Sequence, residues 1–227
     1  SEAPPGECTM AMLAEDALAV ADAAGAARFH YMGISIGGMV GIWLGAHAAD
    51  RVDRLVLCNT AATLPANLWA ERIARVRAGG VAAIVDAVLS RWFTAGYLAR
   101  ADENLASARA TLLAVDPDGY IGCCAAIRDM DIAANLKAIL APTLVTTGTH
   151  DVATPKDLGI AIAAAIAGAR CVELPVAHIP VHEAPGLFAH TVLGFLVASP
   201  VATERERYDH GLARRKEVLG RRYVEER

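Results

Sequence analysis

The sequence predicts an α/β fold in which a mainly parallel sheet carries a helical lid. Two observations indicate this fold. Short apolar runs of strand length alternate with helical patterns near both ends of the chain. Between them, over about residues 65–137, several helical stretches follow one another with no strand. Alternation of strands and helices favours a parallel sheet, and the strand-free insertion is then expected to lie on it as a lid.

The first alternating stretch is expected to begin with a helix. Apolar positions recur at helical spacing over residues 10–24, between Thr9 as candidate N-cap and Gly25 as candidate C-cap. The elements expected next are a strand at 28–34, a helix at 36–47 and a buried strand at 52–58. Four glycines in the 36–47 segment suit a helix that packs closely against a sheet.

The insertion and the last part of the chain complete the predicted order. The helices expected in the lid cover residues 68–77, 81–91, 104–113 and 119–130. The alternation resumes with a strand at 143–147, a helix at 156–167, a strand at 170–174 and a closing helix at 183–197. We therefore expect one α/β domain over residues 1–199, and a linker with the start of a second domain over residues 200–227.

Composition narrows the class of protein. The 227 residues are 55% hydrophobic and 20% charged, which is typical of a globular chain. A net charge of −4 gives no attraction for nucleic acid. No membrane span and no signal peptide are expected. The five cysteines form no C-x-x-C pair, and no histidine spacing indicates a metal, so a cytoplasmic protein with reduced thiols and no cofactor is expected.

A G-x-S-x-G motif lies between the strand expected at 28–34 and the helix expected at 36–47. It places Ser35 between Gly33 and Gly37. A serine on a sharp strand-to-helix turn projects its hydroxyl above the edge of the sheet, and flanking glycines leave room for the neighbouring backbone. The bare motif arises by chance in many chains, but its place between a strand and a helix predicts that Ser35 is a nucleophile.

A nucleophilic serine needs a base and an acid that orients the base. In folds with this turn the partners follow in the order Ser, acid, His, each just past the end of a strand. Asp151 and His178 meet both conditions, and no carboxylate follows the strand at 52–58. Two alternatives remain open: His182 competes as the base, and Asp151 could instead cap the helix that starts at residue 156.

The oxyanion formed by attack on a carbonyl needs two backbone N–H donors. Ile36, which follows the nucleophile, is expected to supply one. The other normally comes from a loop after an earlier strand of the sheet. Because no such segment precedes residue 28, we expect the N-terminal strands and this second donor to lie upstream of Ser1.

Several stretches resemble the 3-oxoadipate enol-lactone hydrolases of the α/β-hydrolase superfamily. They are GISIGGMVG at 33–41, VDRLVLCNTAA at 52–62, RWFT at 91–94, GYIGCCAAIRDMD at 119–131, GTHD at 148–151 and TP at 154–155. The lid segment at 123–131 is the most specific, and the resemblance covers about residues 1–197. It implies hydrolysis of a small-molecule lactone, 3-oxoadipate enol-lactone, to 3-oxoadipate by a Ser-His-Asp triad in the β-ketoadipate pathway of aromatic catabolism. The chain departs from this family at residues 179–182, which read IPVH where polar residues are usual.

The substrate that this resemblance implies carries a free carboxylate, which an arginine would bind by paired hydrogen bonds. Trp69 and Arg72 in the first lid helix are the candidate pocket residues, with Arg128 and Arg91 as weaker alternatives. A packed tryptophan and a solvated arginine explain the first pair equally well.

The charged tail has a resemblance of its own. Residues 207–220, RYDHGLARRKEVLG, are similar to the opening of a 4-carboxymuconolactone decarboxylase, an enzyme found fused to lactonases of this family. This implies self-association or contact with decarboxylase-like subunits through the tail. A solvated charged helix is the alternative.

Two other functions remain open for the whole chain. A general carboxylesterase or a perhydrolase would use the same triad under a different lid. A truncated chain with no catalytic role is the other alternative, since an apolar strand without its neighbour leaves an exposed sheet edge.

Overall fold

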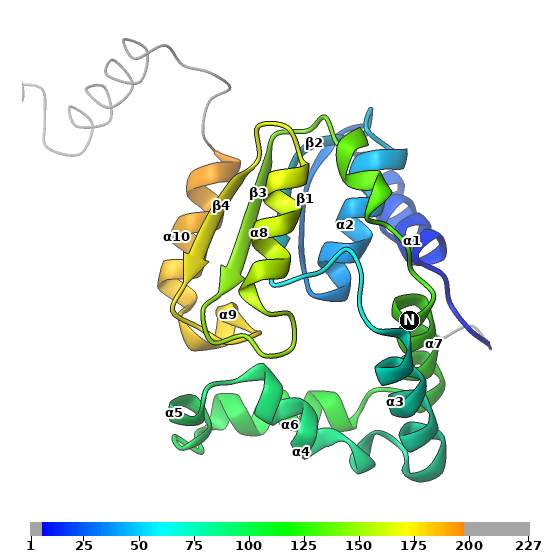
Figure 1. Cartoon of the computed structure of the whole chain (residues 1–227), viewed down its shortest axis with the longest axis vertical. Coiled ribbons are helices and arrows are strands. Elements are labelled where there is room, and N and C mark those ends of the chain that lie inside the picture. The colour runs from blue at the N-terminus through cyan, green and yellow to red at the C-terminus, as the bar shows by residue number, and fades with distance from the viewer. Residues whose placement is uncertain (1–5, 198–227) are drawn as a thin grey trace, which may run out of the picture. The chain divides into compact units, whose positions relative to one another are not determined.

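Four parallel strands form the sheet in the part of the chain that the structure describes, residues 6–197 of a computed structural model. They lie side by side in their order along the chain (Figure 1). The strands are β1 (Phe29–Ile34), β2 (Val52–Cys58), β3 (Thr143–Gly148) and β4 (Arg170–Leu174). Gly33 pairs with Leu57, Leu57 with Val145, and Val145 with Cys171, so the carboxyl ends of the strands meet at one edge. The predicted α/β fold with a parallel sheet is confirmed.

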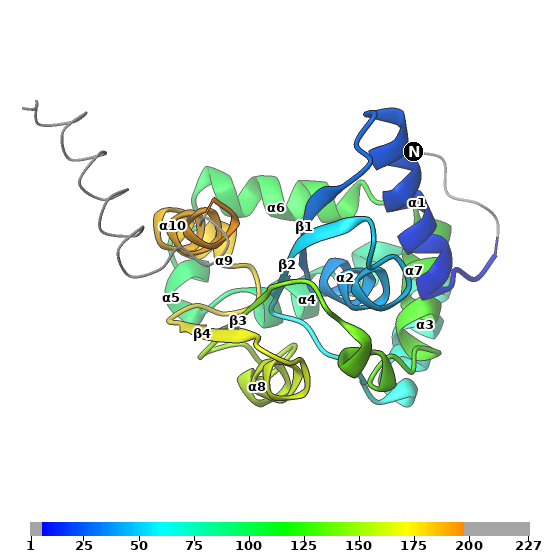
Figure 2. The same cartoon turned by 90° about the horizontal axis from the view of Figure 1, so that it is seen from above.

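Helices connect these strands and cover the sheet. α2 (Ile36–His47) links β1 to β2, and α8 (Lys156–Ala165) links β3 to β4. α1 (Met10–Ala23) packs on α2. Seen from above, α2 and α8 lie on one face of the sheet, and α10 (Pro185–Leu196) lies, up to Leu193, on the other (Figure 2). Right-handed crossovers between parallel strands place successive connecting helices on the same face, which explains the position of α2 and α8.

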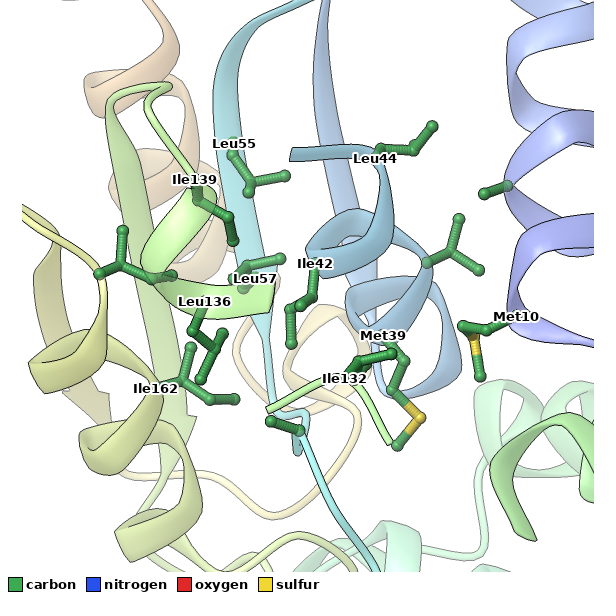
Figure 3. Close-up of a cluster of buried hydrophobic side chains, with 14 of the residues drawn as sticks. Met10, Met39, Ile42, Leu44, Leu55, Leu57, Ile132, Leu136, Ile139 and Ile162 are labelled. Carbon is green, nitrogen blue, oxygen red and sulfur yellow. The ribbon is translucent and has the colours of Figure 1, made fainter. Parts of the chain in front are cut away.

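The main hydrophobic core lies between α2 and the sheet. Ile42 and Leu44 of α2 and Leu55 and Leu57 of β2 are fully buried there (Figure 3). The close packing expected of this helix depends on its glycines: a Cβ on Gly41 would lie 2.9 Å from a methyl group of Leu57. Larger side chains would push α2 away from the sheet and open the core.

The lid contains helices and no strand, as predicted. It comprises α3 (Ala66–Gly79), a 3-10 turn (Val81–Ala83), α4 (Val85–Trp92), α5 (Ala95–Leu98), α6 (Glu103–Leu113), α7 (Pro117–Arg128) and a second 3-10 turn (Ala134–Ala138). Its helices bury a hydrophobic cluster of their own, which includes Ile73, Val76, Val88, Leu89 and Ile121. The lid therefore packs as a second layer with a separate core.

Two predicted helices differ from those observed. The helix expected at 81–91 begins only at Val85, because the N–H of Ile84 bonds to the carbonyl of Val81 and so tightens the preceding turn into a 3-10 helix. The helix expected at 183–197 begins only at Pro185, as α10, and Glu183 instead ends a separate short helix, α9 (Pro180–Glu183). Pro185 lacks an N–H group and is favoured at the first position of a helix, so α10 starts anew there.

The chain divides into two units, residues 1–193 and 194–227. Of the second unit the structure describes only residues 194–197, the end of α10. The predicted boundary at 199–200 and the tail similar to a decarboxylase lie outside the described residues.

Within residues 6–197 no single helix is long and apolar enough to span a membrane. α6 and α7 taken together have the length and composition of a span, but the pair is bent by 90°.

Candidate active site

Ser35 occupies a strained turn between β1 and α2. Its backbone angles are φ 55° and ψ −119°, in a region that residues other than glycine rarely adopt. Two hydrogen bonds hold the turn: the Ser35 N–H donates to the Cys58 carbonyl at 3.0 Å, and the Thr60 hydroxyl donates to the Ser35 carbonyl at 2.7 Å. Gly33 is required by space, since a Cβ there would lie 2.1 Å from the carbonyl oxygen of Gly37. The turn therefore presents the serine side chain above the sheet.

Ile36 is the first residue of α2, directly after this turn. The N–H groups of a first helical turn have no partner within the helix, and the helix dipole adds positive potential there. The Ile36 N–H is therefore suited to stabilise an anion that forms on a group attacked by Ser35.

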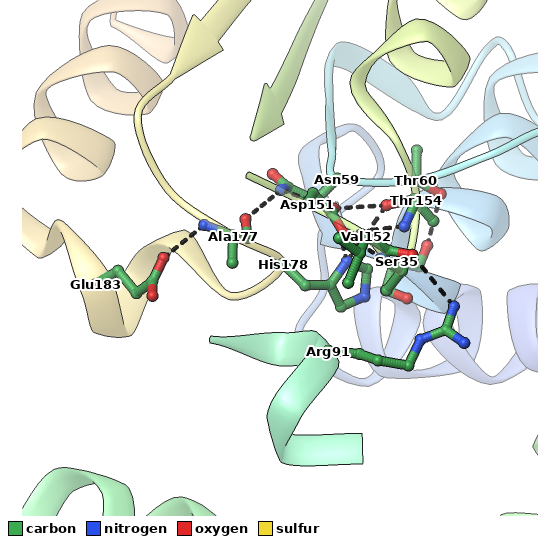
Figure 4. Close-up of polar contacts among 11 residues, drawn as sticks. Ser35, Asn59, Thr60, Arg91, Asp151, Val152, Thr154, Ala177, His178 and Glu183 are labelled. Carbon is green, nitrogen blue, oxygen red and sulfur yellow. Dashed lines mark hydrogen bonds and ion pairs between the residues drawn. The ribbon is translucent and has the colours of Figure 1, made fainter. Parts of the chain in front are cut away.

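Asp151 and His178 form a buried pair beside Ser35. Their side chains are 0% and 3% exposed, and Nδ1 of His178 lies 2.8 Å from Oδ2 of Asp151 (Figure 4). Burial alone would raise the pKa of Asp151, but hydrogen bonds from His178 and Thr154 hold it below its ordinary value. The carboxylate is therefore charged at neutral pH and orients the imidazole. In Figure 4 the ring of His178 points toward Ser35.

The structure supports neither alternative, His182 as the base or Asp151 as a helix cap. The ring of His182 packs edge-on against Phe93, with 5.7 Å between ring centroids. α8 has Pro155 at its N-cap and no side-chain cap hydrogen bond, so Asp151 does not cap it. Instead, Oδ1 of Asp151 accepts the N–H groups of Ala153 and Thr154 at 2.8 and 2.9 Å, within its own loop.

Sequence reasoning missed two residues that hold Asp151. The Thr154 hydroxyl donates to Oδ2 at 2.8 Å. The side-chain amide of Asn59 donates both to Oδ2 of Asp151 at 3.1 Å and to the Ala177 carbonyl at 2.9 Å, next to His178. Asn59 directly follows β2, so its place at a strand end was the available signal. It is fully buried and its backbone φ is 44°.

A cavity of about 150 Å³ opens between these residues and the lid. Ser35, Ile36, Ala153, Thr154 and His178 form its floor. The remaining lining comes from Leu64, just before the lid, and from the lid residues Trp69, Arg72, Val88, Arg91, Trp92, Tyr120, Cys123, Cys124 and Ile127. The cavity thus joins the candidate nucleophile and base to a mostly apolar pocket that contains two arginines.

The two arginines of the cavity face no acidic side chain among its lining residues. Arg72 lies over the ring of Trp69, with its guanidinium carbon 4.7 Å from the ring centroid. Arg91 donates to the Val152 carbonyl at 3.3 Å. Burial and the charge of Arg72 lower the pKa of Arg91, and nearby Asp151 opposes them. The lid side of the cavity is therefore positive.

The structure separates Arg128 from the other candidate binding residues. Arg128 does not line the cavity, and its guanidinium instead pairs with the carboxylates of Glu7 at 2.8 Å and of Asp129. Trp69, Arg72 and Arg91 do line it. Within residues 6–197 no group of three or more His, Cys, Asp or Glu side chains is arranged to hold a metal ion.

Known proteins resemble this chain in both sequence and structure. The family model described as "alpha/beta hydrolase fold" matches residues 1–185. The curated protein "3-oxoadipate enol-lactonase 2" of Acinetobacter baylyi is 31% identical over 193 residues, which are 85% of this chain and 72% of that protein.

Two solved structures resemble the fold closely. The enol-lactonase of Burkholderia xenovorans is 41% identical, with a TM-score of 0.85 over 87% of this chain and 76% of that one. A hydrolase from Pseudomonas aeruginosa is 44% identical, with a TM-score of 0.84 over 87% and 75% of the two chains. The likeness extends over both the sheet and the lid.

Proposed function

The chain belongs to the α/β-hydrolase family, and from this premise we propose that it hydrolyses an enol-lactone bearing a free carboxylate, namely 3-oxoadipate enol-lactone, to 3-oxoadipate. The observation that carries the proposal is the shared cavity. It joins Ser35 and the Asp151–His178 pair to Arg72 and Arg91. The enol-lactonases among its relatives support the choice of a lactone. This activity would place the chain in the β-ketoadipate pathway.

In the proposed reaction Ser35 is the nucleophile. Its Oγ attacks the lactone carbonyl while Nε2 of His178 takes the hydroxyl proton, and Asp151 stabilises the resulting imidazolium. The Ile36 N–H donates to the oxyanion of the tetrahedral intermediate, an interaction worth about 3 kcal/mol in comparable enzymes.

Collapse of the intermediate breaks the bond between the carbonyl carbon and the ring oxygen. The ring opens, the acyl group stays on Ser35, and the enol oxygen leaves as an enolate. A proton returned by His178 converts this enolate to a ketone. His178 then activates a water molecule, which attacks the acyl-enzyme and releases the second carboxylate of the product while the proton returns to Ser35.

Arg72 is the proposed binding residue for the free carboxylate of the substrate. It is half-buried, its guanidinium is held against Trp69, and it lines the same cavity as Ser35. A planar guanidinium can form two parallel hydrogen bonds with a carboxylate, and a partly buried site strengthens them. Arg91, already bonded to the loop of Asp151, adds positive potential near the reacting carbonyl.

The experiment is a substrate comparison with the full chain. We expect hydrolysis of the enol-lactone with its free carboxylate, and a kcat/KM at least about tenfold lower for the methyl ester of that carboxylate. Equal rates with the methyl ester and with simple aryl acetates would identify a general carboxylesterase instead. A folded protein that hydrolyses none of these substrates would refute the proposal.

A further inference from the structure

The loop that carries His178 is bonded directly to the lid. The carbonyl of Trp92, the last residue of α4, accepts the N–H of His178 at 3.0 Å and the N–H of Ile179 at 3.2 Å. The lid backbone therefore fixes the main chain of His178, while Asp151 fixes its ring from the sheet side.

Glu183 joins the same two segments a second time. One carboxylate oxygen accepts the N–H of Thr94 at 2.6 Å and the hydroxyl of Thr94 at 2.8 Å. The other accepts the N–H of Ala177 at 2.5 Å, a contact drawn in Figure 4. Glu183 ends α9, five residues after His178, so its side chain reaches back across the loop to the residue before the histidine.

We propose that Glu183 is a positioning residue for His178, which it holds in place by fastening the histidine loop to lid residues 92–94. The proposal rests on the proposed roles of Ser35 and His178. A carboxylate suits this place because three donors converge on it and an ionised carboxylate only accepts hydrogen bonds. The Thr94 hydroxyl donates its hydrogen to Glu183, and its oxygen accepts the N–H of Tyr97 at 3.2 Å.

This junction also restricts how the lid can move. The two bonds to the Trp92 carbonyl and the three to Glu183 connect the α4–α5 corner to the histidine loop. A motion of this corner would displace His178 from Ser35, and displacements of about 1 Å cost as much as 100-fold in rate. Lid opening that preserves catalysis must therefore take place in segments other than residues 92–94.

The test replaces Glu183 and compares kcat with KM. Glu183→Ala is expected to lower kcat about 10- to 100-fold while KM changes less than about twofold, because the base is misplaced and the lid pocket is retained. Glu183→Gln keeps one acceptor oxygen but turns an amide donor toward one of the N–H groups, so a smaller loss is expected. The matched control is Glu173→Gln, which removes an exposed ion pair with Lys156 and should leave both constants unchanged.

A proton resonance provides a readout that does not depend on activity. The proton between Nδ1 of His178 and Asp151 should give a far-downfield NMR signal in the wild type and in Glu173→Gln. In Glu183→Ala this signal should shift or broaden. An unchanged signal together with an unchanged kcat would overturn the proposal, as would a change in KM alone.

A third variant covers the case in which Glu183→Ala does not fold. Thr94→Val keeps the shape of the side chain but removes the hydroxyl donor, and kcat should fall several-fold with an altered proton signal. Thr94→Val with full kcat and an unaltered signal would contradict the proposal. If the wild-type chain hydrolyses no lactone, the proposed function fails, and the proton signals alone still decide whether Glu183 positions His178.

Discussion

The floor and the lid of the cavity use polar side chains in opposite ways. On the floor, Asp151 and His178 are buried, and the carboxylate accepts hydrogen bonds from four neighbouring residues. In the lid, Arg72 and Arg91 line the cavity opposite no carboxylate. The floor is built on strand ends whose register leaves little freedom, whereas the lid has a separate hydrophobic core.

This difference separates two tasks. A carboxylate that accepts hydrogen bonds from four neighbouring residues is held in a fixed geometry, which catalysis requires. A guanidinium that pairs with no carboxylate keeps most of its N–H donors for a ligand, even where, as in Arg91, one of them binds a backbone carbonyl. We therefore expect changes on the floor to lower kcat for every substrate, and changes in the lid to alter the choice of substrate.

Replacing the nucleophile should give the largest effect. Ser35→Ala removes the attacking oxygen and is expected to lower kcat by about 10⁴- to 10⁶-fold for all substrates. The melting temperature should stay nearly constant, since the Ser35 side chain takes part in none of the hydrogen bonds that hold the turn. Ser90→Ala, an exposed serine on α4, is the matched control. Residual turnover within tenfold of the wild type would show that the floor does not carry the chemistry.

Asp151→Asn should come next, with a loss of about 10⁴-fold in kcat. The amide turns a donor toward Nδ1 of His178, which favours the tautomer that carries its proton on Nε2 and so cannot take the proton of Ser35. A loss confined to KM would contradict the role of the floor.

The same variant tests stability against pH. Because the pKa of Asp151 is held below its unfolded value of about 3.8, its charged form stabilises the folded state. This contribution is fully present above about pH 4 and is lost as the pH falls through the folded pKa. In chemical denaturation, the free energy of unfolding of the wild type should exceed that of Asp151→Asn most at neutral pH. This difference should shrink below pH 4. A difference that grows toward acid would contradict the assigned pKa direction.

A lid substitution should discriminate between substrates. Arg72→Gln is expected to raise KM for the carboxylate-bearing lactone roughly 30-fold, equivalent to about 2 kcal/mol for a charged hydrogen-bonded pair. Hydrolysis of the methyl ester should change little. Arg75→Gln, an exposed position one turn further along α3, serves as the control. Equal losses on both substrates would mean that Arg72 supports the fold or the chemistry.

The smallest effect is expected on the outer surface of the lid. Arg109 pairs with Asp86 at 2.6 Å, but their side chains are 44% and 82% exposed. Arg109→Ala should change the free energy of unfolding by less than about 0.5 kcal/mol and leave both kinetic constants unaltered. A loss above about 1 kcal/mol would show that this ion pair helps to hold the lid in place.

Sequence alone could place the sheet, the lid and the candidate triad, because all three leave local signals. Strand ends carried Asp151 and His178, and the G-x-S-x-G motif marked the turn at Ser35. The partners that hold the site were missed because they are distant in sequence: Asn59 lies 92 residues from Asp151, and Glu183 lies 89 residues from Thr94.

Helical periodicity likewise could not show which arginines enter the cavity. Arg128 turns away because two carboxylates bind it, that of the adjacent Asp129 and that of Glu7, which lies 121 residues earlier in the chain; nothing in the local pattern indicates the contact with Glu7. The break before α10 had a signal in Pro185, although the periodic pattern ran across it.

Covalent labelling of the folded chain with an aryl phosphonate tests the central claim most directly, because such reagents react with a serine that a neighbouring base activates. After tryptic digestion, peptide 29–51 contains Ser35 as its only serine. Our account predicts one phosphonyl group on this peptide in the wild type and none in Ser35→Ala. A folded wild-type chain that stays unlabelled, or that carries the label on another peptide, would contradict the assignment of Ser35 as the nucleophile.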